Sequence, residues 1–173
     1  TVLGAVDAPQ IKLSEVTNLF WDITADRTMN KSEHQIRKWK NPRKRAIKNL
    51  IKVIGDKSLN EIVRDDMIAF RDWFINRIKT DGISVNLANK EIGSTKNMIE
   101  AVDEHYKTGL DTAWLFNKLG LKDRPQEARR SPFETDYIKD VLLKAENLNK
   151  LNPQARAIFC ILAETGARPK EIC

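Results

Sequence analysis

Cysteine is scarce in this sequence, and the patterns that mark exported or membrane-spanning proteins are absent. Cys160 and Cys173 are the two cysteines. Neither lies in a CxxC pair or near a His cluster, so the sequence supports neither a disulfide framework nor a zinc site. No apolar run approaches the roughly 18 residues that a membrane-spanning helix needs, and the first six residues lack the order of a secretory signal. We therefore expect a reduced, cytoplasmic setting and no membrane partner.

An initiator Met is also missing, so we expect an excised piece of a longer protein, and whether a domain precedes Thr1 is left open. The 173 residues suffice for one full domain, or for one domain and part of another. A composition with 41% hydrophobic and 31% charged residues is typical of a folded globular chain.

Apolar residues recur at helical spacing along almost the whole chain, and alternating strand patterns are hard to find. N-caps are expected at Ser14 and Ser84, and Pro42 should bend or restart the second helix. The sequence therefore predicts an all-α protein. The expected helices cover about residues 13–23, 36–54, 67–80, 85–106, 113–119, 135–145 and 153–165.

The net charge of +6 is unevenly distributed. Between His34 and Gly55 there are eight basic residues and no acidic one. Of the 30 basic residues in the chain, 22 lie outside this segment, against 24 acidic residues, so the remainder is slightly negative. A local positive field attracts polyanions. We call this segment the basic window; it contains Arg37, Lys38, Lys40, Arg43, Lys44, Arg45, Lys48 and Lys52.

The basic window has two interpretations. Most charge runs are solvated helix faces, but such faces normally carry opposite charges four residues apart. Here like charges repel, at a few tenths of a kcal/mol per pair, and a phosphate backbone would relieve that repulsion. We therefore predict phosphate contacts that position the protein without reading sequence. The predicted contact residues are Lys38, Lys40, Arg43, Lys44, Arg45 and Lys48.

The polar side of the predicted fourth helix is a second candidate for DNA contact. Asn can pair with adenine edges and Lys with guanine edges in the major groove, and Gly93 would let the helix backbone approach closely. An ordinary solvent-facing side is an equal alternative, which Glu91 and Glu100 favour. The candidate residues on this side are Asn86, Asn89, Lys90 and Lys96.

Residues 120–133 differ in character from the helices on either side. Gly120, Pro125 and Pro132 break helices, and the charged residues between them leave no apolar stripe. This pattern is typical of an interdomain linker. Its basic residues could touch a phosphate backbone, and Arg129 and Arg130 are the candidates.

The chain ends on Thr-Gly-Ala-Arg-Pro-Lys-Glu-Ile at 165–172, followed by Cys173. Arg168 comes after a helix-ending Gly and before a Pro that should open a new helix. A guanidinium beside a helix N-terminus is a favourable place for a phosphate, and its fork can bind two oxygens at once. An ordinary surface corner, with Arg168 paired to Glu164 or Glu171, explains the same residues.

This motif, and the order of the elements before it, resemble the tyrosine recombinases, the phage integrase family. The layout agrees over roughly residues 12–173, while the specific motif is the last eight or nine residues. The resemblance implies an N-terminal extension at 1–11, a SAM-like core-binding domain of four to five helices at 12–119, a basic linker at 120–133, and the first helices of a truncated catalytic domain at 134–173. It implies that Arg168 is the first catalytic arginine, which stabilises charge on the scissile phosphate. Glu171 would be the structural acid that orients Arg168 or its loop.

The family's other catalytic groups would follow Arg168, so the chain is expected to be inactive by itself. Tyr106 and Tyr137 precede Arg168 and are interpreted as packing residues, not nucleophiles. His34 and Arg37 spell His-x-x-Arg by coincidence. The four tryptophans, one in each helical segment, are predicted to be core anchors.

The resemblance implies a DNA-binding fragment of a site-specific recombinase that cuts and rejoins DNA through a phosphotyrosine link, in DNA integration or recombination. It implies no nucleotide cofactor and no obligatory metal. Double-stranded DNA and other protomers would be the partners. A non-catalytic helical DNA-binding regulator, in which Arg168 is incidental, is the alternative. A protein-interaction bundle is a third reading, and it predicts no salt-dependent DNA affinity.

Overall fold

The computed structural model describes residues 9–122, 131 and 133–172. Within these ranges the secondary structure is helical and no strand is formed, apart from one isolated bridge between Lys12 and Ser58. The all-α prediction is confirmed. The chain divides into two compact units, 1–124 and 125–173. The predicted helical domain at 12–119 falls inside the first unit, and 134–173 falls inside the second, but the predicted domain boundaries stay predictions.

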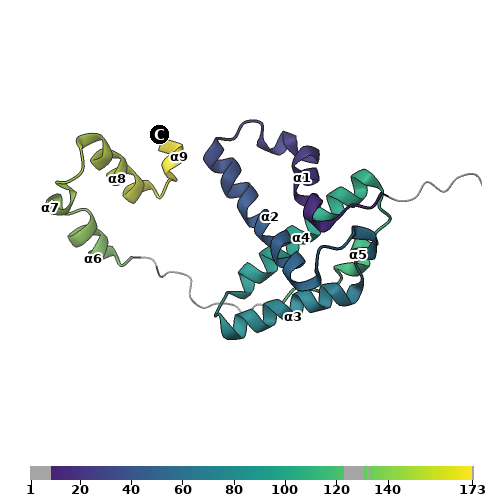
Figure 1. Ribbon diagram of the computed structural model, residues 1–173. Helices are drawn as coiled ribbons and strands as arrows, with labels where there is room; N and C mark the ends of the chain where they lie inside the picture. Colours follow the sequence, from purple (N-terminus) through teal and green to yellow (C-terminus); the bar gives the residue numbers. More distant parts are fainter. Residues whose placement is uncertain (1–8, 123–130, 132, 173) are drawn as a thin grey trace, which may run out of the picture. The chain divides into compact units, whose positions relative to one another are not determined.

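The first unit is built around α4, which packs against α1 and α2, while α2 also packs against α1 and α3 (Figure 1). The chain order of its elements is α1 (Leu13–Ile23), η1 (Ala25–Thr28), α2 (Glu33–Ile54), η2 (Leu59–Glu61), α3 (Arg64–Thr80), α4 (Val85–Tyr106) and α5 (Thr112–Leu115).

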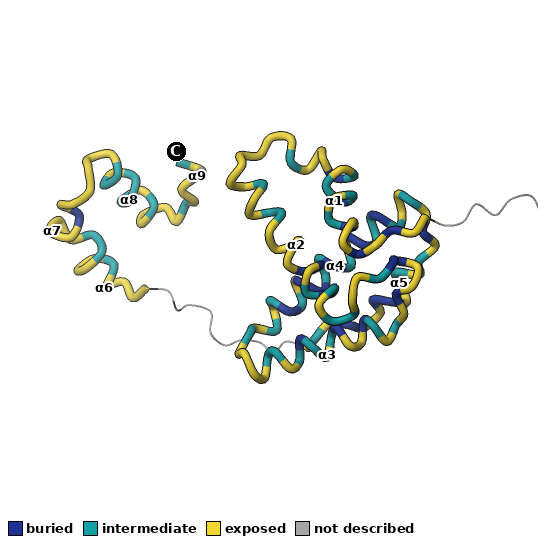
Figure 2. The backbone as a smooth tube through the Cα atoms, in the orientation of Figure 1, coloured by how far each residue is buried: buried dark blue, intermediate teal, exposed yellow. Residues whose placement is uncertain are grey.

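The core of the first unit is made by one apolar stripe from each of the long helices. Phe20 of α1, Leu50 of α2, Phe70 of α3 and Ile99 of α4 are among its fully buried side chains. Burying a side chain of this size stabilises the fold by about 1.5–3 kcal/mol. Burial is confined to one part of α2: the helix is mostly exposed over its N-terminal half and becomes buried toward its C-terminal half (Figure 2).

The predicted N-caps give one confirmation and one correction. Ser84 caps α4, because its hydroxyl accepts a hydrogen bond from the Leu87 N–H at 3.1 Å. Ser14 does not cap α1. Lys12 occupies the N-cap position, and the Ser14 N–H donates to Asp56 Oδ1 at 2.9 Å. A free N–H in the first turn of α1 is therefore satisfied by the carboxylate of Asp56, which is distant in the chain, and not by the hydroxyl of Ser14.

The expected restart of the helix at Pro42 is wrong, because α2 runs without interruption from Glu33 to Ile54 with Pro42 inside it. The expected bend stays a prediction. A proline in a helix interior removes one backbone hydrogen bond and costs roughly 3 kcal/mol. The following turns of α2 bury Ala46, Ile47 and Leu50 against the core. This burial offsets the local penalty, so the helix continues beyond Pro42.

The expectation that all four tryptophans anchor the core is wrong for Trp114. Trp21, Trp39 and Trp73 are half-buried and pack against the core, whereas Trp114 is 56% exposed. Trp114 lies on α5, which is a single turn, and its ring faces the guanidinium of Arg64. A helix this short cannot bury both Leu115 and its neighbour on the opposite side.

The second unit is formed by short helices. In chain order these are α6 (Thr135–Tyr137), the π-helical turn η3 (Ile138–Leu142), α7 (Ala145–Leu148), α8 (Pro153–Thr165) and α9 (Pro169–Ile172). Asn152 caps α8 through a hydrogen bond from the Ala155 N–H, and Pro153 stands at its first position. Gly166 ends α8 with a φ of 64°, a left-handed conformation that favours glycine.

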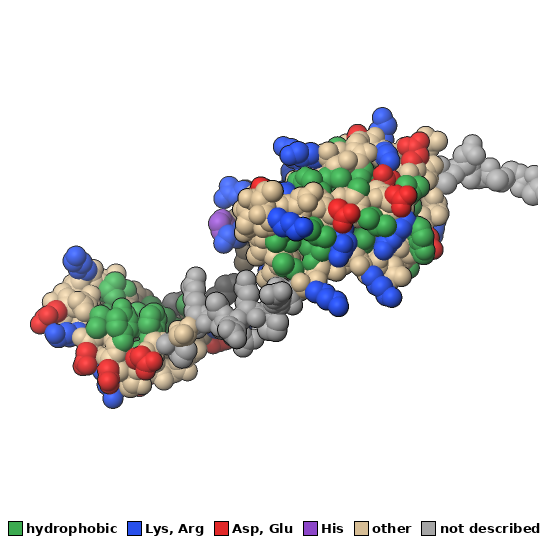
Figure 3. Space-filling view, turned by 90° about the horizontal axis from the view of Figure 1, so that it is seen from below, with side chains coloured by type: hydrophobic (Ala, Val, Ile, Leu, Met, Phe, Trp, Pro, Cys, Tyr) green, Lys and Arg blue, Asp and Glu red, His purple; other side chains and the backbone are tan. Residues whose placement is uncertain are grey.

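Hydrophobic side chains remain on the surface of the second unit. Phe133, Tyr137, Val141, Leu151 and Ile161 are exposed, and Leu148 is buried. Such side chains gather on the face of this unit that is visible in Figure 3. Tyr137 is predicted to be a packing residue, but it is 43% exposed, and its ring stacks on the exposed ring of Phe133 at 5.3 Å between centroids.

Candidate nucleic-acid interface

The basic window lies entirely on α2, and part of it forms one continuous exposed stripe. Arg37, Asn41, Lys44 and Lys48 follow one another at intervals of four, three and four residues, which places them on one side of the helix. All four are exposed. No ion pair within the described part of the chain involves Lys38, Lys44 or Lys48. These charges are therefore available to an external anion.

Three other basic residues of α2 lie against aromatic rings of the first unit. The Lys40 ammonium lies 5.2 Å from the centroid of the Trp21 ring, and Lys52 lies 5.9 Å from that of Trp73. The Arg43 guanidinium stacks over Trp39. Its pKa is lowered, first by burial and second by the charge of Arg27. Cation–π contacts of this kind contribute about 0.5–1 kcal/mol at exposed sites, so these cations have a structural role.

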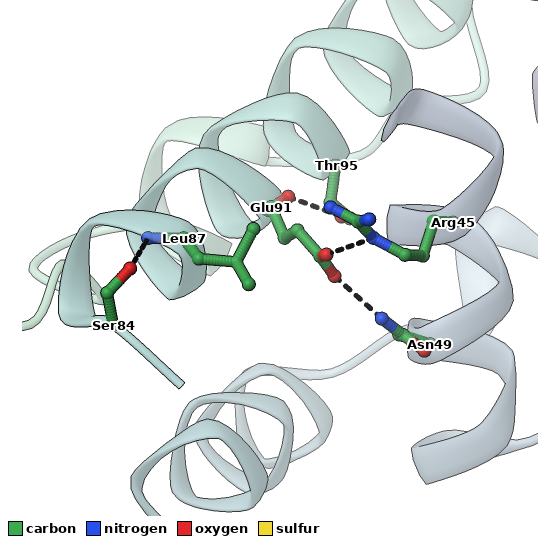
Figure 4. Close-up of polar contacts among 6 residues, drawn as sticks. All are labelled: Arg45, Asn49, Ser84, Leu87, Glu91 and Thr95. Atoms are coloured by element: carbon green, nitrogen blue, oxygen red, sulfur yellow. Dashed lines mark hydrogen bonds and ion pairs between the residues drawn. The ribbon is translucent and has the colours of Figure 1, made fainter. Parts of the chain in front are cut away.

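Arg45 is both paired within the first unit and partly exposed to solvent. Its Nε donates to Oε1 of Glu91 on α4 at 2.5 Å, and Asn49 Nδ2 donates to the other carboxylate oxygen at 2.6 Å (Figure 4). Glu91 is 4% exposed, while the side chain of Arg45 is 53% exposed. The pair joins α2 to α4 and leaves one end of the guanidinium at the surface.

Glu91 and Asn49 are residues that the sequence pattern did not single out as partners of the basic window. The sequence pattern favours a solvent-facing Glu91 on α4, but the structure buries it. Its partners lie 46 and 42 residues away in the chain, so no local spacing could have revealed the contact.

The candidate residues on α4 have different environments. Asn86 and Lys90 are exposed, and Lys96 is half-buried. Asn89 is already engaged: its Oδ1 accepts from the Leu121 N–H at 2.8 Å, and its Nδ2 donates to the Leu121 carbonyl at 2.9 Å. Asn89 thus holds the chain where it leaves the first unit, and its amide is not free to read a base edge.

Glycine at position 93 is not required by the packing of the protein itself. A Cβ built on Gly93 would have no neighbour within 4 Å. Gly93 shares one side of α4 with Asn86 and Lys90, since the spacing is four and then three residues. The absence of a side chain here leaves room for the close approach of another molecule.

At the other end of the chain, Arg168 lies at an exposed corner between α8 and α9. The corner is shaped by its neighbours: the Ala167 N–H donates to Thr165 Oγ1 at 3.2 Å, and the Thr165 hydroxyl donates to the Ile161 carbonyl at 2.6 Å. Glu171 Oε2 accepts from the backbone N–H of Arg168 at 2.8 Å. This acid therefore holds the loop of Arg168, and none of the ion pairs in the described ranges involves the Arg168 guanidinium.

Arg129 and Arg130 lie outside the described residues. Tyr106 is half-buried and packs against the core. His34 and Arg37 lie near the start of α2, where their side chains approach to 3.5 Å. Among the described residues, no group of three or more His, Cys, Asp or Glu side chains could hold a metal ion, and no helix is long and apolar enough to cross a membrane.

Fold and surface together define an all-α chain with an exposed basic helix. The chain is similar to an Escherichia coli (strain K12) protein named "Putative defective protein IntQ". The two are 24% identical over 135 residues, which make up 74% of this chain and 32% of that protein. The chain thus matches about a third of the length of its relative. No protein-family model matches the chain, and no solved structure matches it.

Proposed function

We propose that this chain is the DNA-binding part of a site-specific DNA recombinase of the tyrosine recombinase, or phage integrase, family. The first unit contacts the phosphate backbone of duplex DNA through the exposed side of α2. The second unit carries Arg168 as the first catalytic arginine, with Glu171 holding its loop. The parent enzyme cuts and rejoins DNA through a phosphotyrosine link, and this chain is inactive by itself.

The observation that carries the proposal is the exposed basic stripe of α2. On this stripe, Lys44 and Lys48 have like-charged neighbours four residues away on the same helix. Neither they nor the exposed Lys38, which lies on another side of α2, have an acidic partner in the described ranges. Like charges four residues apart destabilise a helix. Binding to a polyanion removes this repulsion and releases counterions from the DNA, which provides the free energy of non-specific binding.

Two further observations support the family assignment. The motif at 165–172 resembles the first active-site box of the family, and its arginine is exposed at a corner where a phosphate could reach it. The similarity to a protein named IntQ agrees with an integrase relationship.

Salt-dependent DNA binding tests the proposal directly. We would measure the anisotropy of a labelled mixed-sequence duplex over a series of salt concentrations. The variant Lys38→Ala/Lys44→Ala/Lys48→Ala is compared with Lys79→Ala/Lys139→Ala/Lys150→Ala, which removes the same charge from exposed positions elsewhere. Each phosphate contact contributes about 0.9 to the slope of log K against log salt. The α2 variant should therefore lose roughly 2.7 of that slope, and the control should lose none.

Two results would contradict the proposal. If the unmodified chain fails to bind duplex DNA at low salt, the first unit is a protein-interaction bundle with a charged surface. If both triple variants lose the same slope, binding depends on net charge and not on α2.

A non-catalytic DNA-binding regulator shares the basic helix and differs only at the second unit. If the protein is a recombinase, we expect a longer protein that contains this chain to carry a His-x-x-Arg box and a late Tyr after residue 173. In that protein, Arg168→Lys should abolish covalent protein–DNA complexes while DNA affinity is kept, because Lys cannot bind two phosphate oxygens as a fork. A regulator would form no covalent complex in either form.

A further inference from the structure

Glu91 is a buried carboxylate directed at a basic helix. Its two oxygens accept hydrogen bonds from Arg45 and Asn49, both on α2, and its own helix α4 lies against α2 (Figure 4). Burying a carboxylate is costly unless it is paired and hydrogen-bonded. Both oxygens of Glu91 are satisfied, so the arrangement is complete on the protein side.

By contrast, the hydrogen-bond donors of Arg45 are only partly used. A guanidinium has five N–H donors in a planar fork. One of them, on Nε, is bonded to Glu91, and the two Nη groups have no hydrogen-bond partner in the described part of the chain. More than half of the side chain is exposed. The Nη pair is the part of arginine that binds two oxygens of one phosphate.

The pair is poorly explained by stability alone. Replacing both members of a buried ion pair by well-packed apolar residues is often neutral or stabilising, so the fold does not need a charged pair at this position. Glu91 also places a negative charge beside a helix that should attract an anion. Because this negative charge opposes anion binding, the presence of Glu91 is better explained by its hydrogen bond to Arg45, which orients the guanidinium.

We propose that Arg45 binds a DNA phosphate through its two Nη groups where α2 meets α4, and that Glu91 is the positioning residue that holds the guanidinium for this contact. The inference rests on the proposed DNA-binding function. Lys44 and Lys48 reach the backbone as flexible point charges, whereas Arg45 is fixed before DNA arrives. Fixing it beforehand lowers the conformational entropy that is lost on binding.

Replacing Glu91 should change DNA affinity in the direction opposite to the one that charge alone predicts. Removing a negative charge near a phosphate should strengthen DNA binding. If Glu91 positions Arg45, then Glu91→Leu should instead weaken binding, by about tenfold for one charge-assisted contact, and lower the salt slope by about 0.9. Glu91→Gln keeps a neutral acceptor for Arg45 Nε and should bind at least as tightly as the unmodified chain.

The experiment uses the full 173-residue chain, a mixed-sequence duplex and the four proteins of a double-mutant cycle: unmodified, Arg45→Ala, Glu91→Leu and the combination. Melting by far-UV circular dichroism ensures that each is folded at the assay temperature. In the Arg45→Ala background, Glu91→Leu should cause no further loss of affinity or slope, because Glu91 acts only through Arg45.

If Glu91→Leu does not fold, the variant Arg45→Lys tests separately whether DNA binding needs the guanidinium fork of Arg45. It keeps the charge and removes the fork, so it should weaken binding about as much as Arg45→Ala, roughly tenfold. Equal affinity of the lysine variant and the unmodified chain would overturn the proposal.

Other outcomes separate this inference from the function on which it rests. Unchanged or tighter binding by Glu91→Leu, or an equal loss with and without Arg45, would overturn the positioning role while DNA binding stands. Absence of DNA binding by the unmodified chain would overturn both.

Discussion

The guanidinium of Arg43 lies over the indole ring of Trp39, 4.3 Å from its centroid, and its Nη1 donates to the Trp39 carbonyl at 2.8 Å. The two residues are one helical turn apart, with Pro42 between them. A proline inside a helix disturbs the carbonyls of the preceding turn, because it has no N–H to donate. Arg43 supplies a side-chain donor in that same turn.

We therefore expect Arg43→Ala to affect folding more than DNA binding. Loss of the stacked guanidinium should lower the free energy of unfolding by about 1 kcal/mol, measured by urea denaturation and far-UV circular dichroism. The salt slope of DNA binding should change little. The exposed neighbour Lys44 serves as the control, since Lys44→Ala should give the reverse pattern; a reduced slope with unchanged stability in Arg43→Ala would contradict this assignment.

Replacing Gly93 separates stability from recognition. Alanine in a helix interior is more favourable than glycine by about 0.5–1 kcal/mol, and the open space around Gly93 imposes no clash. Gly93→Ala should therefore raise the melting temperature of the chain. If the polar side of α4 approaches DNA closely, the same variant should bind DNA less tightly. Higher stability with unchanged affinity would place α4 away from the DNA, as the alternative of a solvent-facing side predicts.

Gly166→Ala should destabilise the end of α8. Gly166 has a φ of 64° and no neighbouring atom that a Cβ would meet, so only backbone strain opposes alanine. That strain is roughly 1–2 kcal/mol for a residue other than glycine. All four tryptophans, Trp21, Trp39, Trp73 and Trp114, lie in the first unit, so amide hydrogen exchange along α8 is the appropriate measurement. Gly166→Asn should be tolerated better than Gly166→Ala. Equal protection of the α8 amides in the unmodified chain and in both variants would contradict this prediction.

Asp81 should contribute to stability in a pH-dependent way. Its pKa is lowered from 3.8, mainly by a hydrogen bond from Arg77 and also by one from Thr80. The unfolded chain therefore binds this proton more readily than the folded protein. The contribution is fully present above pH 3.8 and is lost as the pH falls through the lower pKa of the folded state. Asp81→Asn should melt earlier than the unmodified protein at neutral pH, and the gap should narrow in acid. A gap of constant size across that range would count against this reasoning.

Local signals in the sequence were sufficient wherever the structure depends on neighbouring residues. The helical period of the apolar residues predicted the all-α class, because one buried stripe per helix is what the core requires. Ser84 before α4, and Pro153 and Gly166 at the two ends of α8, follow from the hydrogen-bonding and backbone preferences of those residues. The expectations of a cap at Ser14 and of a helix restart at Pro42 fail for a common reason, since a distant carboxylate and a buried surface outweigh local preference.

The candidate site divides in the same way. Residue order alone establishes that a strong positive charge lies on one helix and that Arg168 comes shortly after a helix-ending glycine. Which of these charges are available to an external anion depends on the folded protein. Lys38, Lys44 and Lys48 face solvent, Arg43 stacks on Trp39, and Arg45 is bound by Glu91 from another helix. Charge is a property of residue type, whereas availability depends on contacts. The contact of Arg43 lies within one turn of α2, but the contact of Arg45 with Glu91 joins segments far apart in the chain and exists only once α2 and α4 have packed.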